Sequence, residues 1–414
     1  MDQHDQNSDA GAGAVFIESD RMGVETQKLY DFLTSRVIGQ ERAARYIARG
    51  AALFRANLRK KKKALVRGAL LFAGPPGVGK TMMAEELSKY LVADIEDAPL
   101  NRIQCGRLTE KHYISELIGS PAGYVKCDEA GLLDQCQIDL PHFAAKFERA
   151  LLSGDAAVKQ LLSKGGAGLL EPLYRHLMPY DSVILFDEIE RAHPEIRKVL
   201  LHIIGDGKLS MSDKSVTSFR NSYIVLTSNI GQDGIQEILS KKEKKVMGFA
   251  NKGESVDNRD GRMVERTKKE IEQELGAPII SRLSGNIVVF RPLERSHCAL
   301  ILDGMLKDIQ APMPLNLIYD DNVREFLLDE GVSAQFGARE LQATVDQHIM
   351  FRLANALDQQ VLHPGDEIRF AMKEGRPAIY RLLPKLPPPR RVLVLPVRPP
   401  PIITPPPSDD NDDK

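Results

Sequence analysis

Gly74-Pro75-Pro76-Gly77-Val78-Gly79-Lys80-Thr81 is the stretch that decides the fold of this 414-residue chain. It fits the pattern G-x-x-x-x-G-K-[ST], in which backbone N–H groups of a glycine-rich loop face phosphates, the lysine reaches the β- and γ-phosphates and the hydroxyl holds Mg²⁺. The apolar run from Ala69 to Ala73 predicts a buried strand that enters the loop, and the helical spacing of apolar residues from Thr81 to Leu91 predicts the helix that leaves it. The segment therefore predicts a site that binds and hydrolyses a nucleoside triphosphate.

Two further apolar runs end in polar residues that suit hydrolysis. Val183 to Phe186 predicts a buried parallel strand that ends in Asp187 and Glu188. We expect Asp187 to complete the magnesium shell and Glu188 to polarise the attacking water. The run from Tyr223 to Ser228 predicts another strand, and Asn229 at its end is placed to orient that water, because strand ends line the ligand crevice of a doubly wound sheet.

Composition excludes several classes of protein. Apolar residues make up 43% of the chain and the formal net charge is −1, which is ordinary for a globular protein and indicates no polyanionic partner. The four cysteines form no C-x-x-C pair, and no stretch reaches the roughly 18 apolar residues of a membrane span. We expect a cytoplasmic protein with no membrane segment. The basic run 59–63 has no interleaved aromatic residue and predicts a solvated helix end in preference to a nucleic-acid contact.

The order of apolar and polar segments predicts four parts. Alternating strands and helices predict an α/β domain with a parallel sheet, and a break at Arg291-Pro292-Leu293 precedes a small α+β lid. Eleven of the last 31 residues are proline, a composition that builds no core. This tail is interpreted as a solvated end or, alternatively, as a proline-motif ligand. The predicted bounds are a flexible leader at 1–25, a large domain at 26–290 with a helical insertion at about 138–178, a lid at 291–383 and a proline-rich acidic tail at 384–414.

Two arginines are candidates for neutralising phosphate charge. Arg282 lies in Ile280-Ser281-Arg282-Leu283, and Arg339 follows Phe336-Gly337-Ala338. Taken singly, each arginine is better interpreted as a surface residue.

Taken together in their order, these segments closely resemble the ATPase module of the Clp family of AAA+ protein unfoldases and disaggregases, from about Val37 to Phe370. The resemblance rests on these segments: Val37-Ile38-Gly39-Gln40, the phosphate loop, the acidic strand Val183 to Glu188, Glu188 to Pro194, Leu226 to Gly231, Ser281-Arg282-Leu283 before Val288 to Phe290, and Gly337-Ala338-Arg339. It implies a P-loop NTPase sheet with helices on both faces and a C-terminal lid. It also implies that Val37 and Ile38 bound the adenine pocket, Asn229 is sensor 1, Arg339 is the sensor 2 arginine, and Arg282 is an arginine finger entering a neighbouring subunit. A ring, most often a homo-hexamer, follows from that resemblance.

Two short segments resemble the parts of the family that handle polypeptide. Gly119 to Val125 resembles the pore loop, so Tyr124 is the candidate that grips a substrate chain; the alternative is a tyrosine packed in an ordinary turn. Val246 to Phe249 lies where peptidase-coupled members carry the tripeptide that docks on a ClpP-like peptidase, and an incidental apolar turn is the alternative.

The chain also departs from the family. Lys126 and Cys127 stand where a glycine and an aromatic residue usually follow the pore tyrosine, and only some 36 residues precede Val37, so we expect substrate recognition to lie elsewhere. For the insertion, an external helical hairpin and a gate at the channel mouth both stay open.

The sequence predicts an ATP-dependent unfoldase or remodelling subunit that threads polypeptide through a ring. The alternatives are an ATP-driven switch or scaffold that remodels one dedicated protein or nucleic-acid complex, and a chain that binds nucleotide without a pore.

Overall fold

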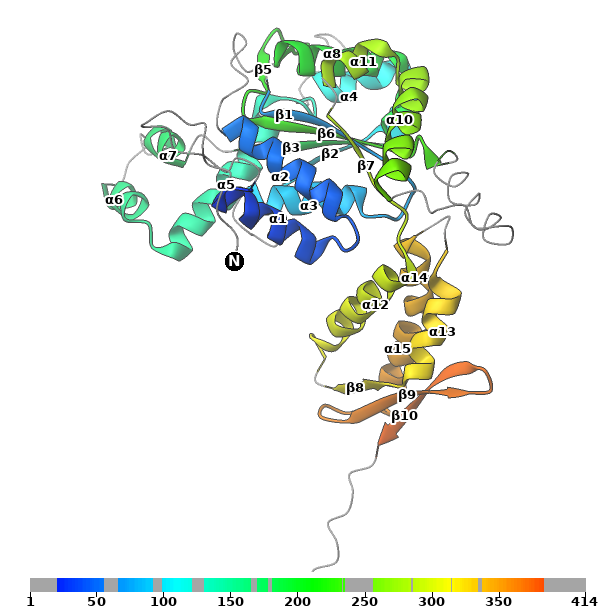
Figure 1. Ribbon diagram of the computed structural model, residues 1–414. Helices are drawn as coiled ribbons and strands as arrows, with labels where there is room; N and C mark the ends of the chain where they lie inside the picture. Colours follow the sequence, from blue (N-terminus) through cyan, green and yellow to red (C-terminus); the bar gives the residue numbers. More distant parts are fainter. Residues whose placement is uncertain are drawn as a thin grey trace, which may run out of the picture.

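The structure is a computed structural model that describes residues 21–55, 66–91, 99–120, 130–164, 170–177, 181–232, 234, 256–283, 286–313, 315–333 and 337–382. Figure 1 shows a large sheet-and-helix body above and a smaller body of helices and strands below it. The predicted tail and the basic run 59–63 lie outside the described residues. Of the predicted leader, residues 1–20 also lie outside them, and helix α1 begins at Val24.

The large body is organised around a five-stranded sheet in the order β2-β3-β6-β1-β7. All its described pairings are parallel, so each strand points its carboxyl end to the same edge. The strands are β1 (Gly68–Ala73), β2 (Asn101–Gln104), β3 (Ser182–Asp187), β6 (Ser222–Ser228) and β7 (Ile287–Val289).

Both faces of this sheet are buried, and residues along each strand alternate between two cores. In β1, Leu71 belongs to one buried cluster while Leu70 and Phe72 belong to the other. In β3, Phe186 and Leu185 divide in the same way. The period of two puts successive side chains on opposite faces, so the apolar runs of the sequence supply both cores at once.

Helices cover each face of the sheet. On one face lie α1 (Val24–Arg36), α2 (Glu41–Arg55) and α3 (Lys80–Leu91). On the other lie α4 (Ile114–Ile118), α8 (Pro194–Asp206), α10 (Val256–Leu275) and α11 (Ala277–Leu283), together with the 3₁₀ turns η1 (Cys105–Arg107), η2 (Lys111–Tyr113) and η3 (Ile189–Arg191) and the hairpin β4 (Lys208–Ser210) and β5 (Val216–Ser218). The predicted α/β fold with helices on both faces is confirmed.

The lid has a hydrophobic core of its own. Helices α12 (Arg295–Gln310), α13 (Asp321–Gly331), α14 (Ala338–Val345) and α15 (Phe351–Asp358) pack on the sheet β10-β9-β8, made of β8 (Asn316–Tyr319), β9 (Glu367–Lys373) and β10 (Arg376–Leu382). Phe370 and Ile368 of β9 are fully buried in this core. The predicted small α+β lid is thus confirmed as part of the fold.

One predicted lid helix is interrupted. The helical spacing of apolar residues from Arg339 to Leu357 predicts one continuous helix. The chain instead forms α14, a π-helical turn at Asp346–Met350 (η4) and then α15. A π turn adds a residue to the helical repeat, and it brings buried His348 against Glu330, with 3.1 Å between Nε2 and Oε2. Apolar periodicity alone does not distinguish such a turn from a continuous helix.

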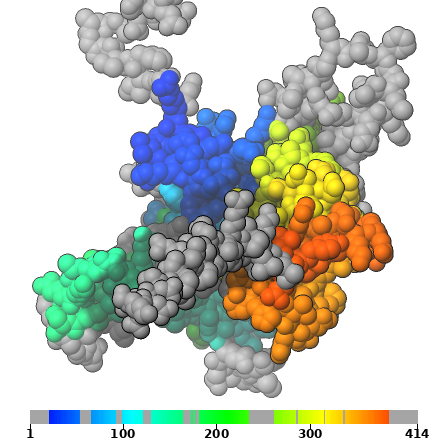
Figure 2. Space-filling model, turned by 90° about the horizontal axis from the view of Figure 1, so that it is seen from below, coloured from blue at the N-terminus to red at the C-terminus, as the bar shows by residue number. Residues whose placement is uncertain are grey.

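The segment after the predicted pore loop forms three helices, α5 (Gln135–Ser153), α6 (Ala156–Lys164) and α7 (Leu170–Leu177). A small cluster of Ala150, Val158 and Leu173 joins them. Asp155 accepts backbone hydrogen bonds from Ala157 and Val158 and so caps α6. Figures 1 and 2 show α6 and α7 projecting to the side of the large body, away from the lid. In the part of the chain described, no helix has the length and apolarity to cross a membrane.

Candidate nucleotide site

A cavity of about 790 Å³ lies between the carboxyl edge of the sheet and the lid. Its volume falls within the roughly 300–1,000 Å³ typical of small-molecule sites. Lining residues from the large body are Ser35 to Ile38, Pro76 to Met82, Glu86, Asp187, Glu188, Thr227 and Asn229. The lid contributes Leu293, Ile301, Gly304, Met305, Asp308, Ala338, Arg339 and Gln342.

Lys80 opens α3 at the bottom of this cavity and is only 8% exposed. Its Nζ donates to the carbonyl oxygens of Gly74 and Pro75, at 2.7 and 2.6 Å, and to Oδ1 of Asn229 at 2.9 Å. Burial lowers the pKa of Lys80 from its ordinary 10.5 to about 8, and the negative charge of Glu190 opposes that shift. A buried cation whose hydrogen-bond acceptors are all uncharged is suited to an anion.

One wall of the cavity is apolar. Val37 is 2% exposed and packs against the phosphate loop, where Gly79 has a φ of +95°. A Cβ at Gly79 would lie 2.9 Å from Cγ1 of Val37, so the close approach of loop and wall requires glycine. Ile38, Ile301 and Met305 extend this wall. Apolar side chains of this kind can pack against the flat faces of a nucleotide base.

Asp187 ends β3 and accepts from three side chains. Oδ1 accepts from the hydroxyls of Thr81, at 3.3 Å, and of Thr227. Oδ2 accepts from Nη2 of Arg102 on β2, at 2.6 Å. The structure therefore brings Thr81 and Asp187 together as the sequence predicts, and it adds Arg102 and Thr227 as partners that the sequence analysis did not single out.

Glu188 follows Asp187 in a left-handed backbone conformation, with φ of +57° and ψ of +55°. Its N–H donates to Oγ1 of Thr227 at 3.0 Å, which holds this turn against β6. Its carboxylate lies 3.1 Å from Nη1 of Arg191 and 3.5 Å from Nδ2 of Asn229. A non-glycine residue in this conformation is uncommon and points to a site that holds its geometry against strain.

Asn229, at the end of β6, forms hydrogen bonds to residues of α3 and of η3. Besides its bond to Lys80, its backbone N–H donates to Oε1 of Glu190 at 3.2 Å. Glu190 is therefore a further site residue that sequence reasoning missed. The available signals were its place two residues after Glu188 and, for Thr227, its place two residues before Asn229 on the same strand.

The lid touches the phosphate loop directly. The N–H of Ala338 donates to the carbonyl oxygen of Gly77 at 3.0 Å, and a Cβ on Gly337 would lie 2.7 Å from the same oxygen. Gly337 also has a φ of +58°. This contact starts α14 at the mouth of the cavity and places Arg339 among its lining residues.

The remaining predicted residues do not line this cavity. Arg282 lies on α11, and its Nη1 donates to the carbonyl oxygen of Leu201 on α8 at 3.1 Å. Gly74 and Pro75 do not line the cavity either, but their carbonyl oxygens accept hydrogen bonds from Nζ of Lys80, which does. Tyr124 and the Val246 to Phe249 segment lie outside the described residues.

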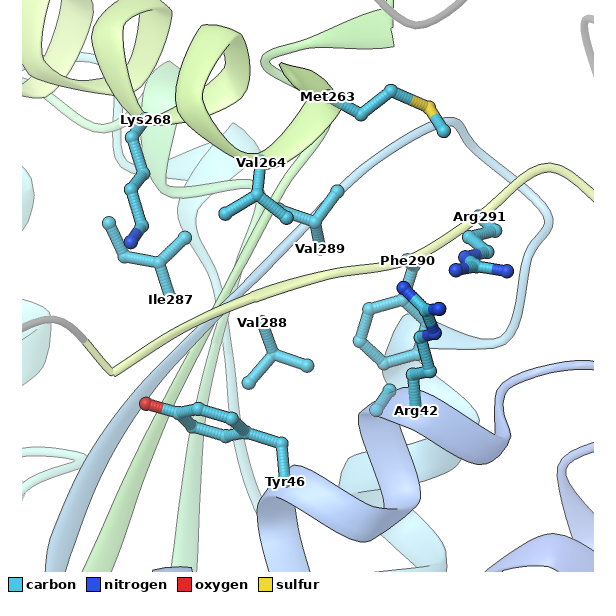
Figure 3. Close-up of a pocket in the computed structure, with 11 residues that line it drawn as sticks. Arg42, Tyr46, Met263, Val264, Lys268, Ile287, Val288, Val289, Phe290 and Arg291 are labelled. Atoms are coloured by element: carbon cyan, nitrogen blue, oxygen red, sulfur yellow. The ribbon is translucent and has the colours of Figure 1, made fainter. Parts of the chain in front are cut away.

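A second, smaller cavity of about 220 Å³ lies beside β7, the edge strand of the sheet (Figure 3). Tyr46 and Arg42 of α2 and Val264 of α10 face it from the two sides of the strand. It contains none of the predicted site residues.

The residues of the large cavity fit a nucleotide with magnesium. The described residues include no group of three or more His, Cys, Asp or Glu side chains that could hold a metal ion by themselves. Magnesium beside phosphates takes one or two protein carboxylates and completes its shell with phosphate oxygens and water. Asp187 with the hydroxyl of Thr81 suits such a shell, and Lys80 suits the phosphates.

A parallel sheet in which β1 enters a phosphate loop and β3, separated from β1 by β6, ends in two carboxylates, together with a lid that carries an arginine into the cavity, defines an AAA+ P-loop ATPase. The family model of the AAA domain (Cdc48 subfamily) matches residues 66–141 and 151–285. That of the C-terminal, D2-small domain of ClpB protein matches residues 293–370. The chain belongs to the AAA domain family and, within it, to the Clp ATPases. Membership of this family implies nucleotide binding.

Curated relatives resemble most of this chain. "Negative regulator of genetic competence ClpC/MecB" of Bacillus subtilis (strain 168) is 31% identical over 358 residues, which are 85% of this chain and 38% of the relative. "Chaperone protein ClpB" of Oceanobacillus iheyensis is 31% identical over 356 residues, 84% of this chain and 37% of the relative. "ATP-dependent Clp protease ATP-binding subunit ClpC" of Staphylococcus aureus (strain USA300) is 29% identical over 366 residues, 84% and 38%. The chain thus spans little more than a third of the length of these relatives.

Proposed function

We propose that the protein is an ATP-dependent unfoldase or remodelling subunit that hydrolyses ATP in a ring and moves a polypeptide through the central pore. The observation that carries this proposal is the cavity in which Lys80, Asp187 and the lid residue Arg339 converge. Such a cavity can couple hydrolysis of the terminal phosphate to the angle between the lid and the large body, because the lid touches the phosphate loop of the large body directly.

The binding roles follow from the contacts. Lys80 would hold the β- and γ-phosphates, and Thr81 with Asp187 would hold Mg²⁺. Magnesium, when bound, neutralises charge on phosphate oxygens. Val37 and Ile38 would contact the base through the apolar wall, and the N–H groups of the loop from Gly77 to Gly79 would face the phosphates.

For hydrolysis, we assign Glu188 as the base that takes a proton from the attacking water. The backbone bond from Glu188 to Thr227 fixes the start of its side chain, and Nδ2 of Asn229 lies 3.5 Å from its carboxylate. Asn229 would orient the same water.

Charge that develops on the phosphates would be met by two arginines. Arg339 lines the cavity of its own subunit. Arg282 lies outside that cavity, on α11, which supports a role in the site of a neighbouring copy. An arginine shared in this way makes hydrolysis depend on assembly, and we propose a homo-hexamer.

The proposed substrate is a polypeptide, and Tyr124 is the proposed gripping residue. Two of the relatives are named as a chaperone and as the ATP-binding subunit of a protease. A ClpP-like peptidase that docks through Val246 to Phe249 extends this proposal. The rival function is an ATP-driven switch that remodels one dedicated complex without threading.

The variant Glu188→Gln tests the hydrolytic part. It should retain bound ATP, stay assembled and lose turnover. Glu195→Gln is a matched control, because Glu195 lies on the first turn of α8, does not line the cavity and forms an ion pair with Lys198. Full turnover by Glu188→Gln would remove Glu188 as the base.

Tyr124→Ala tests threading. A fluorescent β-barrel protein with an unstructured tail serves as the substrate, and its fluorescence reports unfolding. Loss of unfolding with retained ATPase activity supports threading, whereas unchanged unfolding by the variant favours the switch. The proteins recovered with Glu188→Gln in ATP then identify the client and any docked peptidase.

A further inference from the structure

Arg282 is held at one place on the outside of the large body. Its Nη1 donates to the carbonyl oxygen of Leu201 on α8, at 3.1 Å. Helices α8 and α11 share one buried cluster that includes Ile203 and Leu283. Leu283 follows Arg282 in the chain. The packing of α8 against α11 therefore fixes the distance between the backbone of Arg282 and the carbonyl oxygen of Leu201.

Gly205 makes room for the guanidinium. A Cβ at Gly205 would lie 1.2 Å from Nη1, 2.4 Å from Cζ and 3.2 Å from Nη2 of Arg282. Any side chain at position 205 would therefore occupy the volume of the guanidinium. We call this space, bounded by Leu201 and Gly205, the guanidinium seat.

The glycine at position 205 is a cost to its own helix. Gly205 lies within α8 (Pro194–Asp206), where glycine is less favourable than alanine by about 0.5–1 kcal/mol. It is not among the glycines with positive φ, so its backbone conformation does not require glycine. By contrast, Gly261 in the middle of α10 has nothing within 4 Å of an added Cβ. What distinguishes Gly205 is the arginine beside it.

The seat leaves the charge of Arg282 available. Among the described residues, Arg282 has one hydrogen-bond acceptor, a carbonyl oxygen, and no carboxylate partner. Its side chain is exposed, and α11 lies on the side of the sheet away from the lid (Figure 1). The carbonyl end of α8 carries partial negative charge, which favours a cation there without neutralising it. The remaining N–H groups of the guanidinium are thus oriented before any phosphate arrives.

We propose that Gly205 is a positioning residue for the finger: it seats the Arg282 guanidinium against Leu201, pre-oriented for the phosphates of a neighbouring copy. This inference rests on the proposed function of Arg282 in trans. Pre-orientation reduces the side-chain freedom that the arginine must lose during hydrolysis, and a displaced guanidinium misses its target.

The test compares Gly205→Ala, Arg282→Ala and the double variant, with Gly261→Ala as the matched glycine-to-alanine control. Arginine fingers are worth about 10³–10⁵ in turnover. We expect Gly205→Ala to lower ATPase turnover by about tenfold or more, with nucleotide affinity unchanged within about twofold. The double variant should be no worse than Arg282→Ala, since both changes remove one interaction. Gly261→Ala should behave as the unmodified protein.

Mixed rings separate a positioning role from a general defect. Subunits with Gly205→Ala keep an intact phosphate loop, whereas subunits with Lys80→Ala keep an intact finger. Mixing the two should restore part of the turnover, as mixing Arg282→Ala with Lys80→Ala should. A Gly205→Ala subunit that stays inactive beside an intact finger would have a damaged site of its own, which overturns the inference.

The remaining outcomes distinguish the two proposals. Normal turnover by Gly205→Ala, with Arg282→Ala inactive, overturns the role of Gly205 and leaves the finger in place. Additive losses in the double variant overturn it as well. Normal turnover by Arg282→Ala contradicts the finger itself, and with it the proposed function on which the inference rests.

Discussion

The ammonium group of Lys80 and the side-chain oxygen of Asn229 are hydrogen-bonded, 2.9 Å apart, although 149 positions separate them in the chain. The bond joins the helix that follows β1 to the end of β6, its neighbour in the sheet. Asn229 thereby supplies an acceptor without supplying a charge. The positive charge of Lys80 stays available, and its proton becomes sensitive to any anion that enters the cavity.

Nucleotide binding should therefore be accompanied by proton uptake in mildly alkaline solution. Burial lowers the pKa of Lys80 to about 8, so a large fraction of this lysine is neutral at about pH 8.5. A phosphate beside it raises the pKa again, because a negative charge favours the charged form. Calorimetry in two buffers of different ionisation enthalpy should show uptake of up to about one proton at pH 8.5 and little at about pH 6.5.

Lys80→Arg is the control, because a guanidinium stays protonated at both pH values. Equal proton uptake by this variant would assign the proton to another group.

By the same linkage, Lys80 makes the free energy of unfolding of the nucleotide-free protein rise between pH 8 and 10.5, since the unfolded chain then holds the extra proton.

Thr227→Val should lower both stability and turnover. Its hydroxyl accepts from the N–H of Glu188 and donates to Asp187, and it is buried. Valine has nearly the same shape and leaves both partners without that bond. We expect the free energy of unfolding, measured in urea, to fall by about 1–3 kcal/mol, and kcat to fall more than nucleotide affinity. Thr227→Ser keeps the hydroxyl and should retain most of both; equal losses in the two variants would contradict the role of the hydroxyl.

Arg102→Ala should strengthen the response to magnesium. Arg102 lies 2.6 Å from Oδ2 of Asp187, the carboxylate that we assign to the metal. Arginine and Mg²⁺ therefore compete for it. Partly exposed ion pairs are worth up to about 1 kcal/mol, so the magnesium concentration for half-maximal ATPase activity should fall by up to about fivefold. Arg107→Ala, an exposed arginine of η1, is the control. A rise in the magnesium requirement of Arg102→Ala would show that Arg102 instead supports the metal site.

Gly337→Ala should separate the lid from the phosphate loop. The added Cβ would lie 2.7 Å from the carbonyl oxygen of Gly77, and the positive φ adds backbone strain. We expect the Kd for nucleotide, measured by fluorescence titration, to rise by about tenfold or more. The far-ultraviolet circular dichroism of the protein should stay unchanged, since the helices themselves remain folded. Gly365→Ala has a φ of +90° with nothing near its Cβ, so it carries the strain alone. Equal effects of the two variants would exclude the contact as the cause.

Much of the fold was predictable because it depends on periodicity. The apolar runs that become β1, β3 and β6 have no polar interruption, which indicates strands buried on both faces. Strand β2 escaped prediction because only Ile103 of its four residues is buried. The hairpin of β4 and β5 has three residues in each strand, too few to show alternation.

The site residues that stand at motif positions were predictable from the sequence. Those whose role depends on contacts between distant parts of the chain were not. Lys80, Asp187 and Asn229 stand at motif positions, and the structure brings them to one cavity. Arg102 reaches Asp187 only because β2 pairs with β3, an arrangement that no local pattern specifies. Gly205 is one glycine in a helical segment, and its meaning depends on an arginine that follows far later in the chain.

The bond from Ala338 to Gly77 is made by the backbone of both partners. Apart from proline at position 338, no substitution deletes its donor or its acceptor, although Gly337 must carry no Cβ for the two backbones to come this close. The side chains on the surface of the lid can therefore change without removing the hydrogen bond that joins the lid to the phosphate loop.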